Sequence, residues 1–164
     1  MKDKDHAHNI YLTLTGKKQG LISAGCSTFD SIGNAYQSSH RDQILVYELS
    51  HTITRDQNVV HHPVTFKKPI DKSSPLLGFG ISNNEEFDAV FEKYRTDTSG
   101  AQVLFYRVKL IKATLSELSV VCPHSLDHND AQPIETVSLN YQSITWEHVK
   151  AGTSAYSFWE ERIY

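Results

Sequence analysis

Histidine, serine and acidic side chains are the residues of this sequence whose types could support metal binding or hydrolysis. The chain has 164 residues and contains nine histidines, some of which lie close together. The closest groupings are His6 with His8, His61 with His62, and His124 with His128 beside Asp127 and Asp130. A zinc site needs three or four ligands that converge on one ion, whereas adjacent residues of a strand point to opposite faces. We therefore expect no metal site, and we interpret residues 124–130 as a solvated loop.

The sequence also lacks the common catalytic and nucleotide-binding patterns. It has no GxSxG nucleophile elbow, and its glycines form neither a GxGxxG nor a GxxxxGK phosphate-binding loop. The net charge of −3 comes from interspersed acidic and basic residues, without a zinc-finger or arginine-rich pattern. We therefore expect no catalytic residues, no cofactor and no nucleic-acid partner.

Length and hydropathy point to one domain that is not inserted in a membrane. The longest apolar runs are too short to span a bilayer, and the charged start MKDKDHAH does not resemble a signal peptide. We expect synthesis in the cytoplasm. Residues 1–8 are predicted to be a flexible extension or an artificial leader, and residues 9–164 a single domain. Cys26 and Cys122 lack CxxC spacing, which favours a buried thiol pair over a disulfide.

Alternating and β-branched segments predict about eight strands, which indicates an antiparallel barrel or sandwich. The expected strands include residues 10–15 and 21–25 around a turn, 43–54, 59–68, the long run 101–116, and 134–149. The strand at 59–68 contains Pro63, so it should lie at an edge or begin at the proline. The run 101–116 is apolar on both faces, and so is the start of 43–54, which predicts burial on both sides.

Residues 67–84, KKPIDKSSPLLGFGISNN, contain the clearest helix start in the chain. The Ser74 oxygen is expected to cap the first turn, and Pro75 suits the first helical position because it has no N–H to leave unpaired. Apolar residues follow, so we expect a short, buried helix near 74–83. This segment should close one flank of the β-structure.

Three other segments leave more than one interpretation open. In residues 87–95, FDAVFEKYR, the i, i+3, i+4, i+7 spacing of apolar residues fits a helix. The alternation of Phe87, Ala89 and Phe91 with other residues fits a short strand. The spacing by itself favours the helix. Residues 26–42 are polar and should form a long surface connection. The aromatic tail, residues 155–164, should dock on its own barrel or on a neighbouring molecule because its rings are unfavourable in water.

Four blocks of the sequence stand out together. They are YLTLTGKKQGLISAG, ILVYELSHTIT, KPIDKSSPLLGFGIS and VSLNYQSITWEH. In order and spacing they resemble the Hcp family, the haemolysin-coregulated proteins of bacterial type VI secretion, over about residues 9–164. The family motif, to which we assign a structural role, consists of Ile70, Asp71, Lys72, Ser73, Ser74, Pro75, Leu76 and Leu77.

The resemblance implies a small antiparallel β-barrel of two packed sheets with one short α-helix. It implies a homohexameric ring whose stacked copies form the inner tube of a contractile injector. A contractile sheath would expel the tube with a spike protein of the VgrG type at its tip, and the lumen would carry or chaperone effector proteins. The protein would then leave the cell through type VI secretion without a signal peptide.

The resemblance also assigns two segments. It makes residues 86–94 a strand, against the helical spacing, and we follow the family here. It places an extended loop, which reaches neighbouring subunits or the next ring, at residues 51–62. The candidate oligomer-interface residues are His51, Thr52, Ile53, Thr54, Arg55, Asp56, Gln57 and Asn58.

The chain departs from compact family members in its charged start and in the longer segments 26–42 and 155–164, which could serve partner contacts. Two functions of other classes remain as alternatives. One is a monomeric ligand-binding β-barrel, which would need an apolar pocket with a few polar groups. The other is an effector enzyme with hydrolase activity, which would need a serine or histidine that converges with an acid in a cleft.

Overall fold

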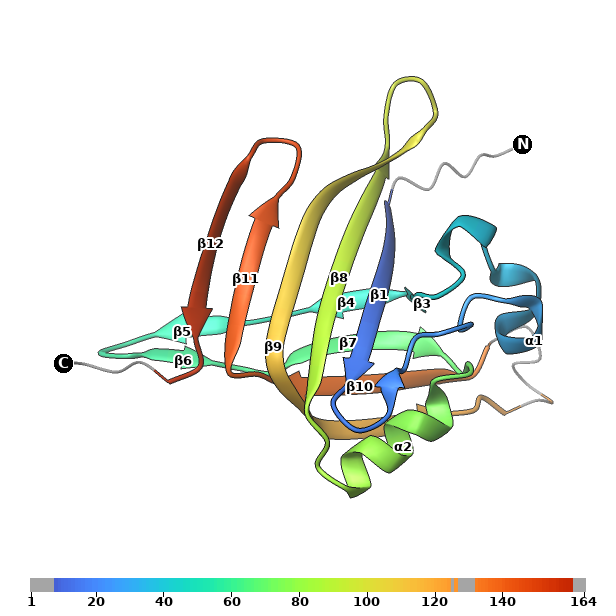
Figure 1. The fold of residues 1–164 in the computed structure, drawn as a ribbon, viewed down its shortest axis with the longest axis horizontal. Helices are drawn as coiled ribbons and strands as arrows, with labels where there is room; N and C mark the ends of the chain where they lie inside the picture. The colour runs from blue at the N-terminus through green and yellow to red at the C-terminus, as the bar shows by residue number, and fades with distance from the viewer. Residues whose placement is uncertain (1–7, 125, 127–131, 161–164) are drawn as a thin grey trace.

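The computed structural model describes residues 8–124, 126 and 132–160, and this part of the chain is mainly β-structure (Figure 1). The strands form one 10-stranded sheet and a separate two-stranded hairpin. The mainly-β class predicted from the sequence is confirmed. The predicted leader, residues 1–8, lies outside the described residues except for His8, at which the first strand begins.

The large sheet is folded into two layers, and every strand pair in it is antiparallel. The first layer contains β1 (His8–Gly16), β2 (Gly20–Leu21), β3 (Ile44–Val46), β8 (Phe87–Thr96), β9 (Gln102–Val121), β11 (Ser143–His148) and β12 (Thr153–Phe158). The second layer contains β4 (Glu48–Ser50), β7 (Val64–Pro69), β10 (Ile134–Asn140) and the last part of β9.

Strand β9 joins the two layers because it bends near its middle. Its first half pairs with β8 and β11, and its second half pairs with β10. Val108 and Leu110 are buried before the bend and Ala113 and Leu115 after it, so the alternation slips by one residue. Lys112 occupies the additional place with a φ of 51°, a left-handed conformation. An extra residue of this kind bends a strand and redirects its side chains.

The core lies between the layers, where large apolar side chains from both meet. Leu12 and Phe91 of the first layer and Phe66 and Leu139 of the second are fully buried. The rings of Phe66 and Phe91 meet edge to face across the layers, with their centroids 5.3 Å apart. The space between the layers is therefore filled by side chains, as in other small β-structures.

The prediction of one strand at residues 43–54 is wrong, because this run belongs to three strands. Strand β3 pairs with β1, strand β4 pairs with β7, and the last residues enter the separate hairpin. The chain crosses between the layers at Tyr47, whose N–H donates to the carbonyl of Lys67. Ile44 and Val46 are buried, whereas the rest of the run is half-buried or exposed. Strand β3 pairs only with β1 and strand β4 only with β7, so no continuous ladder closes the sheet into a barrel.

Two further predicted strands differ from the structure. The strand predicted at 21–25 is shorter, and the strand predicted at 59–68 is divided in two. The strand at 21–25 is reduced to Gly20–Leu21, because the backbone turns directly after it. The strand at 59–68 is interrupted at Pro63 and resumes as β7 at Val64, which confirms that a strand begins at the proline. Strand β7 is not at an edge, since it pairs with β10 on one side and β4 on the other.

Strand β8 resolves the ambiguous segment at residues 87–95. The helical spacing favoured the wrong structure, and the strand implied by the family resemblance is confirmed. Phe87, Ala89 and Phe91 are all buried, whereas Asp88 is exposed. The alternation of buried and exposed residues is that of a strand with one face on the core. The helical spacing was misleading because nine residues are too few for it to be distinctive.

The predicted helix is confirmed as α2 (Ser74–Ser82). Its Leu77 is fully buried, and Gly80 lies against the ring of Phe87 and the side chain of Leu115. The polar connection 26–42 follows the surface as predicted. It contains three short helical turns, α1 (Phe29–Ile32), η1 (Gly33–Ala35) and η2 (Ser38–His40).

The expectation that both faces of β9 are covered is not met within one chain. Ile111 and Val121 on this strand remain 36% and 60% exposed. The aromatic tail is docked only in part, because Trp159 packs against the core while Tyr156 and Phe158 are exposed. The remaining aromatic residue of the predicted tail lies outside the described residues.

Candidate assembly interface

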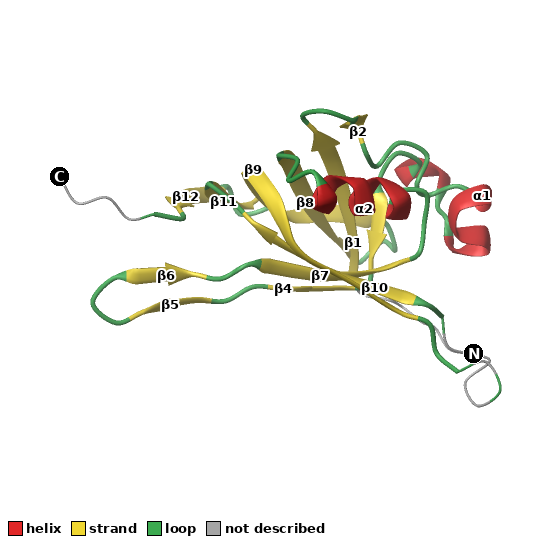
Figure 2. Cartoon of the chain, turned by 90° about the horizontal axis from the view of Figure 1, so that it is seen from below, coloured by secondary structure: helices red, strands yellow, loops and turns green. Residues whose placement is uncertain are grey.

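The hairpin of β5 (Ile53–Arg55) and β6 (Val59–His61) projects furthest from the two layers. It continues from the ends of β4 and β7, and Figure 2 shows it extending away from the rest of the sheet. Its two strands pair with each other and with no other described strand. We call residues 51–62 the arm.

The predicted interface residues all lie in this arm. Thr52, Thr54, Arg55, Asp56, Gln57 and Asn58 are exposed. Ile53 and His51 are half-buried, and His51 lies at the base of the arm. An isolated two-stranded hairpin is only marginally stable in water, so the arm depends on contacts at its base or with a partner.

The base of the arm is held by histidines on both sides of one tyrosine. His51 Nε2 lies 2.8 Å from the Tyr141 hydroxyl, and His61 Nδ1 lies 2.7 Å from the same oxygen. Tyr141 follows β10, and its ring meets the ring of Trp159 edge to face, with centroids 4.8 Å apart. The other nitrogen of His61, Nε2, lies 3.0 Å from the hydroxyl of Ser157 in β12. The arm is thus joined to both the second layer and the last strand.

The family motif at residues 70–77 forms a buried ionic network instead of an exposed site. Lys68 in β7 is fully buried, and its Nζ lies 2.9 Å from Asp71 Oδ1 and 2.5 Å from Glu135 Oε1. The Ser73 backbone N–H and hydroxyl both donate to Asp71 Oδ1. Buried charges of this kind are stable only when they are paired and hydrogen-bonded. The motif therefore ties the start of α2 to strands β7 and β10.

The expected capping role of Ser74 is wrong. Helix α2 takes Ser73 as its N-cap and has no side-chain cap bond. The Ser74 hydroxyl accepts instead from the Asp71 N–H at 2.9 Å and donates to Glu135 Oε1 at 2.7 Å. The buried carboxylate of the neighbouring strand thus competes with the helix end for this serine. Pro75 lies in the first turn as expected.

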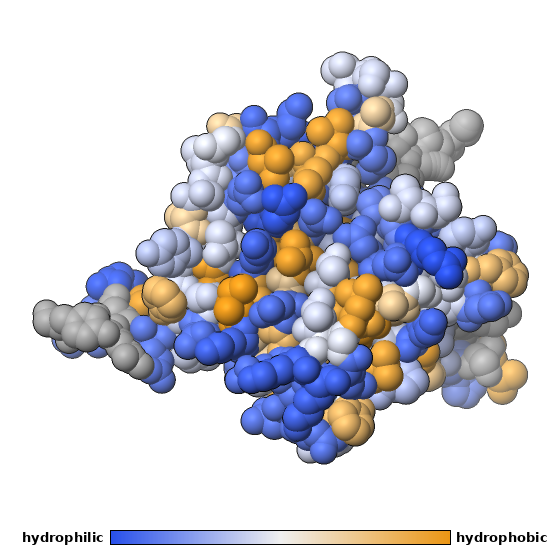
Figure 3. Space-filling model, in the orientation of Figure 1, coloured by the Kyte–Doolittle hydropathy of each residue, from blue (hydrophilic) through white to orange (hydrophobic). Residues whose placement is uncertain are grey.

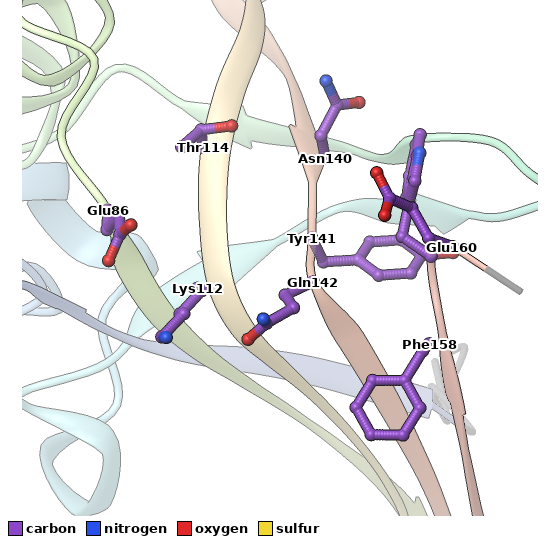
Figure 4. A pocket seen from close by; sticks show the side chains of 9 residues that line it. Glu86, Lys112, Thr114, Asn140, Tyr141, Gln142, Phe158 and Glu160 are labelled. Carbon is purple, nitrogen blue, oxygen red and sulfur yellow. The ribbon is translucent and has the colours of Figure 1, made fainter. Parts of the chain in front are cut away.

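A surface groove lies on the other side of Tyr141 (Figure 4). Tyr141, Phe158 and Trp159 provide aromatic walls, and the charged side chains are Glu86, Lys112 and Glu160. The groove has no serine or cysteine paired with a histidine. Its aromatic and charged residues can support binding of another surface, but they do not form a nucleophile–base pair.

The described residues offer no metal-binding group either, since no three or more histidine, cysteine or acidic side chains converge among them. The predicted loop around His128, Asp127 and Asp130 lies outside the described residues, as does His6. Both cysteines are free, but only Cys26 is buried, so the prediction of a buried pair is wrong for Cys122. Burial, followed by the charge of Asp71, raises the pKa of the Cys26 thiol to about 12, which makes it a poor nucleophile.

Sequence reasoning missed the residues that hold the arm and the motif in place. Lys68 occupies the same face of β7 as the buried residues Val64 and Phe66, and a lysine at such a position signals a buried ion pair. His61 was considered only as a metal ligand, whereas it is a buried hydrogen-bonded side chain. Its contact with Tyr141 joins residues 80 positions apart, and no local pattern carries such information.

No described helix has the length and apolar character needed to cross a membrane. The geometry of the described residues is that of a mainly-β structure from which one hairpin projects. It does not define a catalytic centre.

Comparison with known proteins gives a consistent result. The family described as "Type VI secretion system effector, Hcp" matches residues 11–148. The "Major exported protein" of Pseudomonas aeruginosa strain PAO1 is 36% identical, over 93% of this chain and 96% of that protein. The uncharacterized protein YhhZ of Escherichia coli K12 is 38% identical, and the match spans 88% of this chain but only 36% of YhhZ.

Two solved structures share the fold closely. A crystal structure of an Hcp protein is 33% identical, with a TM-score of 0.89, and covers 95% of this chain and 100% of that chain. The secreted protein Hcp3 of Pseudomonas aeruginosa is 35% identical, with a TM-score of 0.85, and covers 94% of this chain and 100% of that chain. The chain belongs to the Hcp family of type VI secretion proteins.

Proposed function

We propose that this protein is a tube subunit of a type VI secretion machine that assembles into hexameric rings. The rings stack into an inner tube, a contractile sheath expels the tube, and effector proteins travel in its lumen. A spike protein of the VgrG type occupies the tip. The protein is made in the cytoplasm and leaves the cell in this way.

The arm is the observation that carries this proposal. Its residues 54–58 are all exposed, and its backbone pairs only within the hairpin. A hairpin of this kind is stabilised when its side chains and edges meet another protein surface. We therefore assign His51, Thr52, Ile53, Thr54, Arg55, Asp56, Gln57 and Asn58 to contacts with a neighbouring subunit or the next ring.

Exposed apolar residues support association at other places. Val120, Val121, Tyr156 and Phe158 are each at least half exposed. Figure 3 shows several separate apolar patches among hydrophilic residues on the face where β1, β8, β9 and β11 lie. A repeated contact that closes after six copies would cover such patches on every subunit.

The two alternative functions have less support. A ligand-binding barrel would hold its ligand in the interior, whereas here Leu12, Phe66 and Phe91 fill the space between the layers. A hydrolase would need a nucleophile beside a base that an acid orients. Ser157 lies 3.0 Å from His61 Nε2, but the other ring nitrogen of His61 meets the Tyr141 hydroxyl instead of a carboxylate. We propose accordingly that the protein acts through assembly and not through catalysis.

Native mass spectrometry with negative-stain imaging tests the proposal. We expect a particle of six times the 18.6 kDa chain mass and annular images. A purely monomeric protein at micromolar concentration, without rings that increase with concentration, would contradict the proposal and favour the ligand-binding alternative.

A further inference from the structure

The side chains at the base of the arm form one connected cluster, which we call the latch: His51, His61, Tyr141, Ser157 and Trp159. Tyr141 and His61 are only 4% and 5% exposed. The ring of His61 stacks on Trp159, with centroids 6.0 Å apart and an interplanar angle of 26°. The latch therefore joins two peripheral elements, the arm and strand β12, to the turn after β10.

The hydrogen bonds of the latch require the imidazole that accepts from the Tyr141 hydroxyl to be neutral. The Tyr141 hydroxyl has one proton to donate and lies between one nitrogen of His51 and one of His61. It can donate to one ring only and accept from the other. If the accepting imidazole gains a proton, both rings direct an N–H at the same oxygen. The phenol proton then has no acceptor within the latch.

Burial favours the same neutral state. Desolvation lowers the pKa of His51 and of His61, and each is lowered further by the charge of a neighbouring histidine, His62 among them. Two backbone carbonyl contacts, at His62 for His51 and at Phe158 for His61, oppose this effect in part.

Charged groups also line the groove next to Tyr141. They are Glu86, Lys112 and Glu160. The neighbouring charges that act on the two latch imidazoles are those of histidines, so no described carboxylate favours their charged form.

We propose that the latch fixes the arm to the body at neutral pH and releases it when His51 and His61 become protonated. The inference rests on the proposed function, because it concerns the surface that we assign to assembly. Tyr141 acts as a positioning residue, since it holds the arm through its hydroxyl group.

The direction of the pH dependence follows from linkage. A released arm exposes its histidines, whose pKa then returns to about 6.5. The released state binds more protons than the latched state as the pH falls below this value, so acidification favours release. Between about pH 7.5 and 5.5, each histidine shifts the equilibrium by at most about tenfold, which is the limit for an imidazole that stays neutral while latched.

Hydrogen–deuterium exchange of the whole chain at these two pH values tests the latch, after correction for the intrinsic pH dependence of exchange. We expect the amides of residues 53–61 to lose protection at about pH 5.5, because a released two-stranded hairpin frays in water. The amides of β1 and β8 should stay protected. Equal protection of the arm at both pH values, or loss of protection throughout the chain, would overturn the proposal.

The Tyr141→Phe variant tests the hydroxyl while it keeps the ring. We expect arm amides to exchange about tenfold faster than in the unmodified chain already at neutral pH, because two hydrogen bonds are lost. The matched control is Tyr156→Phe, since Tyr156 is 69% exposed in the adjoining strand. The pH effect is the logarithm of the ratio between the protection of the arm amides at about pH 7.5 and their protection at about pH 5.5. The His51→Gln variant should halve this logarithm. Identical arm exchange in Tyr141→Phe and Tyr156→Phe would overturn the proposal.

Ring formation, followed by native mass spectrometry, separates failure of the latch from failure of the proposed function. Absence of rings at any pH would refute the proposed function, while exchange in the monomer would still test the latch. Rings that form while arm protection is independent of pH would refute the latch and leave the proposed function intact.

Discussion

The family motif at residues 70–77 and the arm at residues 51–62 differ in where their polar groups find partners. The motif directs its polar atoms inward, where Lys68, Asp71 and Glu135 are buried and paired. The arm exposes most of its polar side chains and pairs its backbone only within one hairpin. The buried polar atoms of the first region find nearly all their partners within one chain, Asp71 Oδ2 excepted, whereas the polar side chains of the second are mostly exposed to solvent. This difference predicts that mutations in the motif affect folding and mutations in the arm affect association.

The largest effect is expected from Leu77→Asp. Leu77 is fully buried in α2, so the variant loses apolar contacts and places an unpaired carboxylate in the core. We expect a loss of about 5 kcal/mol or more, which is comparable to the whole stability of a small domain. Circular dichroism should show an unfolded chain. Phe79→Asp is the control, because Phe79 in the same helix is 49% exposed, and it should leave the chain folded.

A smaller but still severe effect is expected from Lys68→Met. The substitution keeps the length of the side chain but leaves the buried carboxylates of Asp71 and Glu135 without their cation. Breaking such a buried pair costs about 3–5 kcal/mol in urea unfolding.

Two further variants give the controls for the ionic network. Lys67→Met removes an exposed lysine whose ion pair with Glu48 spans 3.6 Å, and it should cost less than about 1 kcal/mol. Adding Asp71→Asn and Glu135→Gln to Lys68→Met should restore part of the stability. If Lys68→Met and Lys67→Met unfold at the same urea concentration, the network does not stabilise the motif.

Two glycines of α2 give a matched pair with opposite expected signs. A Cβ at Gly80 would lie 2.6 Å from the ring of Phe87, so Gly80→Ala should cost about 1–3 kcal/mol through overpacking. A Cβ at Gly78 meets nothing within 4 Å, so Gly78→Ala should gain about 0.5–1 kcal/mol from helix propensity. Thermal unfolding of both variants measures the difference, and equal midpoints would contradict the close packing of α2 on β8.

The smallest effect on stability is expected in the arm. Charging its tip with Gln57→Glu and Asn58→Asp should change the free energy of unfolding by less than about 0.5 kcal/mol, because both residues are exposed. The same variant should weaken ring or stack formation in native mass spectrometry. Loss of the circular dichroism signal would place the tip in the folded core and remove the contrast between the two regions.

Local patterns predicted those parts of the fold that depend on neighbours in the chain. Helix α2 was predicted within one residue of its end because Pro75 and the apolar run act within a few positions. The strand start after Pro63 was one of the two outcomes predicted for that strand, for the same reason. The helical spacing at 87–95 gave a wrong prediction. This segment is a strand because it pairs with β1 and β9, and the local spacing contains no information about that pairing.

The sequence by itself determined the mainly-β class and the short helix through composition and spacing, and the family through the order of four blocks. The projecting segment was predicted only from the resemblance to that family. Only the tertiary structure decided that 43–54 is divided among three strands, that Ser74 bonds Glu135 instead of capping the helix, and that Tyr141 lies between His51 and His61. The physical reason is the same in each case. These outcomes depend on which distant groups compete for a hydrogen bond or a place in the core, and that competition is settled only when the layers pack together.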